Sequence, residues 1–143
     1  SGRKIPTMLD YNTHISKDSM FNTPPVFSIY VSMLTLQWLK DLGGVDKIEK
    51  LNQRKADLLY NEIDRNSLFT GTANKEDRSN MNVCFLLTDI SKEDTFNSMW
   101  NKAGIRGIKG HRSVGGYRAS IYNAMPIESV QVLVDVMKKL EQN

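Results

Sequence analysis

The strongest constraint on this chain is a helix that is apolar around almost its whole circumference. The sequence Thr-Pro-Pro at 23–25 favours a helix start, because the Thr23 hydroxyl can cap free amides and proline at the first helical positions gives up no needed donor. We expect the helix to run to about Lys40. Its apolar side chains fall at the helical period and on the other faces too: Phe27, Tyr30, Val31, Leu34 and Trp38, then Ile29, Met33 and Leu36. Such a helix should be buried on most sides, so another surface has to cover it.

The rest of the chain alternates between helical and strand patterns. The first 25 residues read as an extended loop, and Gly43-Gly44 ends the apolar helix. We expect further helices over 45–65, 91–103 and 126–142, with Ser91 as a cap, and strands over 68–70, 81–87, 105–109 and 117–122. Counted from the second strand, the order β-α-β-β-α predicts an α+β fold in which helices pack on one side of a small mixed sheet.

Composition narrows the classes of function. A chain of 143 residues with 40% hydrophobic and 24% charged residues is typical of a globular protein. No apolar run is long enough to span a membrane, and the 19 basic and 16 acidic residues are interspersed, which gives little support for nucleic-acid binding. The N-terminus carries no secretory signal, so we expect a cytoplasmic protein. Cys84 lies in the apolar run 83–87, which favours a buried free thiol.

Cationic side chains gather in one loop and at the start of the strand that follows it. Residues 109–118 read Lys-Gly-His-Arg-Ser-Val-Gly-Gly-Tyr-Arg, a pattern that favours anion binding. Alternation puts the side chains of the strand on two faces: Arg118, Ser120 and Tyr122 against Tyr117, Ala119 and Ile121. The planar guanidinium of Arg118 on a stiff strand suits a carboxylate. The alternative is a solvated hairpin tip with ordinary charges.

A second polar motif precedes the apolar helix. Residues 19–25, Ser-Met-Phe-Asn-Thr-Pro-Pro, combine a helix N-terminus with the carboxamide of Asn22 and the hydroxyl of Thr23, which together suit a phosphate. Simple helix capping would explain the same residues. His14 has no cysteine or carboxylate at ligand spacing, so no metal site is expected. No Ser-His-acid pattern supports nucleophilic hydrolysis.

The two motifs together resemble one known family. Residues 19–25, 109–116 and 118–126 are similar, in sequence and in order, to the C-terminal part of the class V aminotransferases, which are pyridoxal-phosphate enzymes of fold type I. The string Gly-His-Arg-x-Val-Gly-Gly-x-Arg-Ala-Ser is typical of the branch that forms O-phosphoserine. The resemblance extends over essentially the whole chain. It implies the small C-terminal domain of such an enzyme over 43–143, preceded over 1–42 by the tail of its large cofactor-binding domain.

The resemblance implies a role for each matching residue. Asn22 and Thr23 match residues that reach the phosphate of pyridoxal phosphate in the neighbouring subunit of a homodimer. His111 and Arg112 match the pair that holds the substrate phosphate, also across the interface, and Arg118 matches the arginine that binds the α-carboxylate. The implied reaction moves an amino group between glutamate and 3-phosphohydroxypyruvate, giving O-phosphoserine and 2-oxoglutarate in serine biosynthesis. Related bacterial enzymes also serve pyridoxine biosynthesis.

The chain departs from the family in what it lacks. In the family, the lysine that binds the cofactor covalently, the acidic partner of the pyridine nitrogen and most of the phosphate cup lie upstream of what is residue 1 here. We therefore expect an inactive fragment with no catalytic residue of its own. Two alternatives remain: a small α+β module that binds a ligand or RNA, and a structural dimerisation domain. The first should show exposed aromatics on its sheet or a basic stripe, and the second leaves Arg112 and Arg118 without a role.

Overall fold

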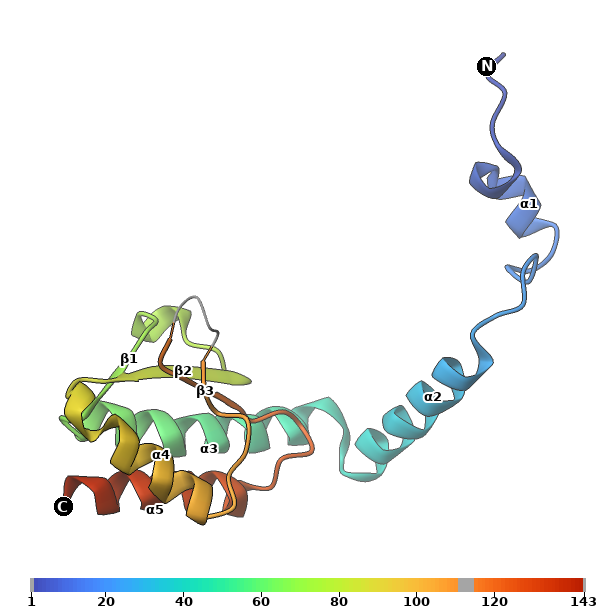
Figure 1. The fold of residues 1–143 in the computed structure, drawn as a ribbon. Coiled ribbons are helices and arrows are strands. Elements are labelled where there is room, and N and C mark those ends of the chain that lie inside the picture. Colours follow the sequence, from blue (N-terminus) through green and yellow to red (C-terminus); the bar gives the residue numbers. More distant parts are fainter. Residues whose placement is uncertain (1, 111–114, 143) are drawn as a thin grey trace. The chain divides into compact units, whose positions relative to one another are not determined.

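The computed structural model describes residues 2–110 and 115–142, and it divides the chain into two compact units. The first unit comprises residues 1–42 and the second residues 43–143 (Figure 1). The division falls at the glycine pair Gly43-Gly44, whose φ angles of 113° and 77° are accessible to glycine without a steric penalty. Across the described ranges, no helix combines the length and the apolar character needed to cross a membrane.

The segment before the apolar helix contains short helical turns. A 3-10 turn over Thr7–Leu9 precedes helix α1 (Tyr11–Ile15), and the Asp10 carboxylate caps α1 by accepting a hydrogen bond from the Asn12 amide at 3.0 Å. The prediction of an extended loop throughout residues 1–25 is therefore wrong. A single side-chain cap starts this helix, and hydrophobic periodicity does not reveal it.

Helix α2 (Val26–Asp41) is the predicted apolar helix, but it begins later than the cap prediction requires. Pro25 occupies the N-cap position and makes no side-chain capping bond. The prediction that Thr23 caps the helix is wrong, because Thr23 lies three residues before the first helical residue and its hydroxyl does not reach the free amides. The Thr23 side chain is exposed and makes no hydrogen bond to any described residue.

None of the α2 residues is buried within the described chain. Phe27 is 79% exposed and even Trp38 is 41% exposed. The hydroxyls of Ser32 and Thr35 donate to carbonyls four residues earlier in the same helix, at 2.8 and 2.9 Å. This helix therefore presents a long, largely apolar surface on which the Ser32 and Thr35 hydroxyls are bonded within the helix.

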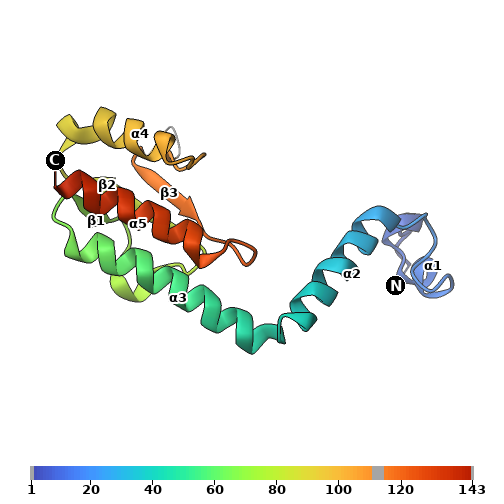
Figure 2. The ribbon, with the colours of Figure 1, turned by 90° about the horizontal axis from the view of Figure 1, so that it is seen from below.

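The second unit is an α+β layer, as the sequence predicts (Figures 1 and 2). Three strands form one sheet in the order β1-β2-β3, and the helices lie on one side of it. The elements are α3 (Gly44–Arg65), β1 (Phe69–Gly71), a 3-10 turn (Lys75–Asp77), β2 (Asn82–Leu87), a 3-10 turn (Ile90–Lys92), α4 (Glu93–Lys102), β3 (Tyr117–Ser120) and α5 (Ile127–Glu141).

Two details of the predicted sheet differ from the structure. Both strand pairs are antiparallel, so the sheet is not mixed. The predicted strand over 105–109 is reduced to a single bridge between Lys109 and Tyr117, because Gly107 takes a φ of 70° and interrupts the extended backbone.

The predicted cap of α4 is also wrong. Ser91 lies within a 3-10 turn, where its hydroxyl donates to the Asp89 carboxylate, and it does not cap α4.

An aromatic cluster fills the core between the sheet and the helices. Phe85 of β2 stacks on Tyr117 of β3 with ring centroids 5.3 Å apart, and Phe96 of α4 meets Tyr117 edge to face at 5.0 Å. Phe69 of β1 contacts Phe96 at 5.2 Å. Each of these rings is at most 4% exposed. Because such ring pairs add about 0.5–1.5 kcal/mol each beyond area burial, the cluster holds the first residue of β3 firmly.

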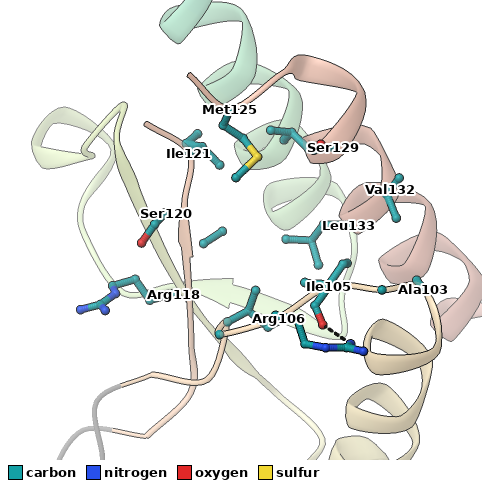
Figure 3. A pocket seen from close by; sticks show the side chains of 15 residues that line it. Ala103, Ile105, Arg106, Arg118, Ser120, Ile121, Met125, Ser129, Val132 and Leu133 are labelled. Carbon is teal, nitrogen blue, oxygen red and sulfur yellow. Dashed lines mark hydrogen bonds between the residues drawn. The ribbon is translucent and has the colours of Figure 1, made fainter. Parts of the chain in front are cut away.

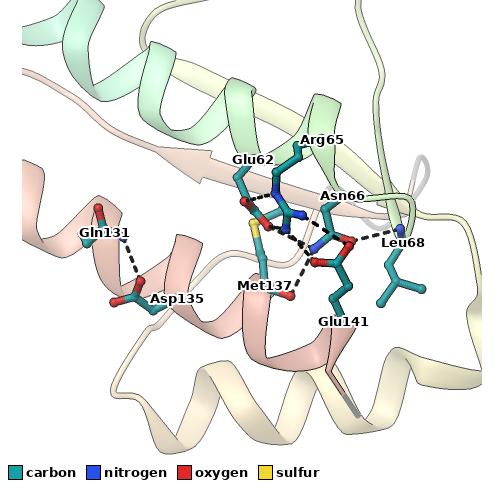
Figure 4. A network of polar contacts seen from close by, with 8 residues as sticks. All are labelled: Glu62, Arg65, Asn66, Leu68, Gln131, Asp135, Met137 and Glu141. Atoms are coloured by element: carbon teal, nitrogen blue, oxygen red, sulfur yellow. Dashed lines mark hydrogen bonds and ion pairs between the residues drawn. The ribbon is translucent and has the colours of Figure 1, made fainter.

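A buried polar network joins the end of α3 to α5 (Figure 4). The carboxylate of Glu62, which is 3% exposed, accepts hydrogen bonds from Arg65 at 2.9 Å and from the Asn66 amide at 3.0 Å. Asn66 also donates to the Met137 carbonyl at 3.2 Å, and Arg65 reaches Glu141 at 2.6 Å. A buried carboxylate is costly unless it is paired, so this network satisfies Glu62 while fixing the two helices to each other.

Removal of residues 1–42 is expected to abolish self-association of the chain, because the apolar surface of α2 needs a cover. We expect residues 1–143 to sediment as dimers or larger species, and residues 43–143 to sediment as a monomer at the same concentration. Phe27→Glu in α2 should weaken the association, whereas Ile90→Glu, which alters an exposed residue of the second unit, should not. If residues 1–143 are monomeric and their α2 amides are fully protected from hydrogen exchange, this expectation is contradicted.

Candidate functional site

The candidate site lies on the open face of the sheet, opposite the helices. Along β3 and at the residue after it, the side chains of Tyr117, Ala119 and Ile121 are buried, whereas Arg118 is exposed and Ser120 is half-buried. The predicted alternation of this strand is therefore confirmed. Cross-strand pairing then places Cys84 of β2 opposite Arg118 and Asn82 opposite Ser120: Asn82, Cys84, Arg118 and Ser120 share this face.

Cys84 is not a core residue, contrary to the sequence prediction. It is half-buried, while its neighbours Val83 and Phe85 are fully buried. The run 83–87 consists largely of apolar residues, but β2 still has one face toward the helices and one face away from them. Its free thiol therefore shares the open face with Arg118.

The backbone under Arg118 is rigid because the preceding residue is fixed by packing and by a hydrogen bond. The Tyr117 hydroxyl donates to the Asn97 carboxamide oxygen at 3.1 Å, and the same oxygen accepts from the Trp100 indole at 3.1 Å. Burial, with smaller contributions from Glu93 and Asp94 (which lie on α4), raises the pKa of Tyr117 to about 12. Tyr117 therefore remains a neutral hydrogen-bond donor at physiological pH.

Polar groups surround Arg118 on the open face. The Asn82 carboxamide oxygen accepts hydrogen bonds from Ser120 at 3.3 Å and from the Tyr122 hydroxyl at 3.2 Å. The pKa of Tyr122 is lowered by hydrogen bonds with Ser120 and Asn82 and by the positive charge of Arg118. The Arg118 side chain forms no hydrogen bond or ion pair with any described residue, so its guanidinium is available to an anion.

The ends of the cationic loop are held together by backbone contacts. The Gly110 amide donates to the Gly116 carbonyl at 2.8 Å, and a Cβ atom on Gly116 would come within 2.8 Å of the Phe85 carbonyl oxygen. The φ of Gly116 is 65°, a second reason for glycine there. His111 and Arg112, the predicted ligands of the substrate phosphate, lie outside the described residues.

The other predicted ligands, Asn22 and Thr23, lie in the first unit and are both exposed. The Asn22 carboxamide makes a long contact of 3.7 Å with the Met8 sulfur. The Met8 carbonyl is bonded to His14 Nε2 at 3.0 Å, which links the 3-10 turn to α1. His14 thus has a structural partner, and no three His, Cys, Asp or Glu side chains of the described ranges gather as a metal site would require.

A cavity of about 330 Å³ lies beside β3, between its outer edge and α5 (Figure 3). Its lining is mainly apolar: Ile105, Ile121, Met125, Val132 and Leu133. The Arg118 side chain points away from this cavity, and the Arg106 guanidinium is bonded to the Asn101 side chain at 2.8 Å. No charged side chain of the described residues is directed into the cavity, so the open face of the sheet remains the candidate site. The sequence contains no signal from which this cavity could be predicted.

The comparisons with known proteins agree with the motifs on which the site is built. The family model described as aminotransferase class-V matches residues 2–133. The chain belongs to the class V aminotransferase family. A curated relative from Flavobacterium psychrophilum, phosphoserine aminotransferase, is 67% identical over 141 residues, which covers 99% of this chain and 40% of the relative. The chain thus spans 40% of the length of that class V aminotransferase.

Solved class V aminotransferases have the same fold over this part of the chain. The phosphoserine aminotransferase from Bacillus circulans subsp. alkalophilus gives a TM-score of 0.85 at 41% identity, covering 96% of this chain and 38% of that chain. The pyridoxal-phosphate-bound phosphoserine aminotransferase from Trichomonas vaginalis gives a TM-score of 0.80 at 36% identity, covering 94% and 39%.

Ser120→Ala is expected to raise the pKa of Tyr122 toward the ordinary tyrosine value of about 10, because the hydrogen bond with Ser120 is the largest cause of its lowering. The phenolate absorbance of the chain, or a carbon NMR titration of labelled tyrosine, would follow the change. Ser129→Ala, which alters a serine on α5, should leave the titration of Tyr122 unchanged. An unaltered Tyr122 titration in Ser120→Ala would show that the open-face network is not formed in solution.

Proposed function

We propose that this chain is the C-terminal part of a phosphoserine aminotransferase. The enzyme would transfer an amino group between glutamate and 3-phosphohydroxypyruvate, giving O-phosphoserine and 2-oxoglutarate in serine biosynthesis, and in some bacteria it would also serve pyridoxine biosynthesis. The observation that carries the proposal is Arg118 on a rigid strand next to a glycine-bounded cationic loop, with a side chain that has no partner among the described residues. The curated and solved relatives support it, since they are phosphoserine aminotransferases.

Arg118 is proposed to bind the α-carboxylate that all the amino-acid and oxo-acid substrates share. A guanidinium binds a carboxylate through two parallel hydrogen bonds, and this geometry requires a side chain that starts from a fixed backbone. The burial of Tyr117 and Ala119 on either side of Arg118 supplies that fixed backbone. His111 and Arg112 are proposed to hold the phosphate of phosphoserine, which would explain why the loop must be both cationic and glycine-bounded.

Asn22 and Thr23 are proposed to bind the phosphate of pyridoxal phosphate. Their exposed carboxamide and hydroxyl groups fit this role: the Thr23 hydroxyl has no hydrogen bond among the described residues, and the contact of Asn22 is long. The cofactor, when bound, supplies the electron sink for the transfer of the amino group. This chain contributes groups that bind and orient, and the lysine that holds the cofactor is proposed to lie in the part of the enzyme that precedes residue 1.

The two units are proposed to belong to different domains of a cytoplasmic homodimer. Residues 1–42 would end the large cofactor-binding domain, whose other elements would cover the exposed surface of α2. Residues 43–143 would form the small C-terminal domain. Asn22, Thr23, His111 and Arg112 would act in the active site of the neighbouring subunit, as the resemblance to the family implies.

The chain alone is expected to be inactive. Lys55 is the one buried lysine among the described residues, and its amine is already bonded to two backbone carbonyls. No described lysine is therefore both buried and available to hold the cofactor. Incubation with glutamate, 3-phosphohydroxypyruvate and pyridoxal phosphate should yield no phosphoserine. Borohydride reduction followed by peptide mapping should show only scattered, substoichiometric labelling of lysines. Stoichiometric labelling of one lysine, with turnover, would refute the proposed division of the enzyme.

Substitution of the two arginines should have different effects in the full-length enzyme. Arg112→Ala removes charge-assisted hydrogen bonds to the phosphate, so kcat/KM for phosphoserine should fall about tenfold to somewhat over a hundredfold, and glutamate should be less affected. Arg118→Lys keeps the charge but loses the bidentate contact, so the binding of both amino acids should weaken by a similar factor. Half-reaction kinetics with each amino acid would measure this. Equal losses in Arg112→Ala, or a loss confined to phosphoserine in Arg118→Lys, would reverse the assignment.

A further inference from the structure

A buried lysine on α3 is bonded to the backbone at the end of β3. Lys55 is 2% exposed, and its ammonium donates to the Ile121 carbonyl at 3.0 Å and to the Tyr122 carbonyl at 2.7 Å. Burial lowers the pKa of Lys55. A buried ammonium is costly, and an apolar side chain of the same volume would pack at this position without that cost. Packing alone therefore does not explain why a lysine occupies this position, whereas its hydrogen bonds to the Ile121 and Tyr122 carbonyls do.

A second contact from the same helix reinforces the first. The carboxamide of Asn52, which is 5% exposed, donates to the Asn123 side chain at 2.8 Å, one residue beyond the carbonyls that Lys55 holds. The Asn52 carboxamide oxygen is itself buried and has no hydrogen-bond partner in the described part of the chain. Lys55 and Asn52 thus hold three consecutive residues, 121–123, from one side.

The same short stretch is also held from the sheet and from the turn that follows it. The Ile121 amide donates to the Met81 carbonyl at 2.9 Å, and the Met125 amide donates to the Tyr122 carbonyl at 2.9 Å. Tyr122 therefore has a carbonyl with two donors and a side chain that reaches Asn82 on the open face. The backbone that leaves β3 cannot rotate without breaking several hydrogen bonds, and at the other end of the strand Tyr117 is fixed by the aromatic cluster.

We propose that Lys55 is a positioning residue for the substrate carboxylate: by fixing the carbonyls of Ile121 and Tyr122 it sets the path of β3, and with it the direction in which Arg118 points. This inference rests on the proposed function of Arg118. Lys55 does not touch the substrate, because it packs under the sheet, on the buried face, and acts through the strand. A guanidinium that makes two parallel hydrogen bonds is sensitive to small changes in direction, so the strand end has to be held from both sides.

The test uses the full-length enzyme with Lys55→Met, which preserves the length of the side chain and removes the donors. The KM values for glutamate and phosphoserine should rise by the same factor, about twofold to thirtyfold, because both share the α-carboxylate, while kcat falls less. Lys50→Met, which alters an exposed lysine of the same helix, should change neither constant. Asn123→Ala, which leaves no buried charge, should shift KM in the same direction by a smaller factor.

Arg118→Lys and the double variant Lys55→Met/Arg118→Lys decide whether Lys55 acts through Arg118. If it does, the two effects on KM should be less than additive, because an arginine that is no longer present cannot be misdirected. Fully additive effects, or a Lys55→Met enzyme that loses kcat with unchanged KM, would overturn the proposal and leave Lys55 a purely structural residue. If Lys55→Met does not fold, the Asn123→Ala result decides, and an unchanged KM in that variant overturns the proposal. An Arg118→Lys enzyme with unaltered KM would instead refute the proposed role of Arg118.

Discussion

The packing of Tyr117 between Phe85 and Phe96 is the contact on which the rest of the second unit depends. It closes the core between the sheet and α4, and it fixes the first residue of β3. Because side chains alternate along a strand, burying Tyr117 forces Arg118 onto the opposite, open face. The candidate site is thus a consequence of the core: the same four-residue strand that completes the hydrophobic layer presents the guanidinium on its other side.

The sequence predicts the parts of this arrangement that are local and periodic. Helix α2, the two faces of β3 and the α+β class follow from the spacing of apolar residues and from glycines and prolines at the ends of elements. Contacts between distant segments could not be predicted in this way. Lys55 reads as one charge among many on an amphipathic helix, and only the fold brings it to the carbonyls of Ile121 and Tyr122. The prediction that Cys84 is buried is wrong, because an apolar run does not show which of its residues face the core.

Among the groups proposed to bind substrate or cofactor, Arg118 is carried by a rigid element. The conformation around Arg118 is set by burial on one face and by hydrogen bonds at both ends of β3, while Gly110 and Gly116 fix the ends of the cationic loop. Chemistry that needs a covalent cofactor link has no counterpart among the described lysines. The proposed division of the enzyme, in which the covalent link to the cofactor lies in another part of a longer protein, would account for this.

The two hydroxyls of α2 that bond to their own helix determine what kind of contact can cover it. Ser32 and Thr35 donate their hydroxyl protons within the helix, and most of the other side chains that α2 exposes are apolar. The fit of large and small apolar side chains is therefore expected to contribute most to the register of that contact. A substitution on either side that conserves polarity but alters shape would therefore shift α2 along its cover.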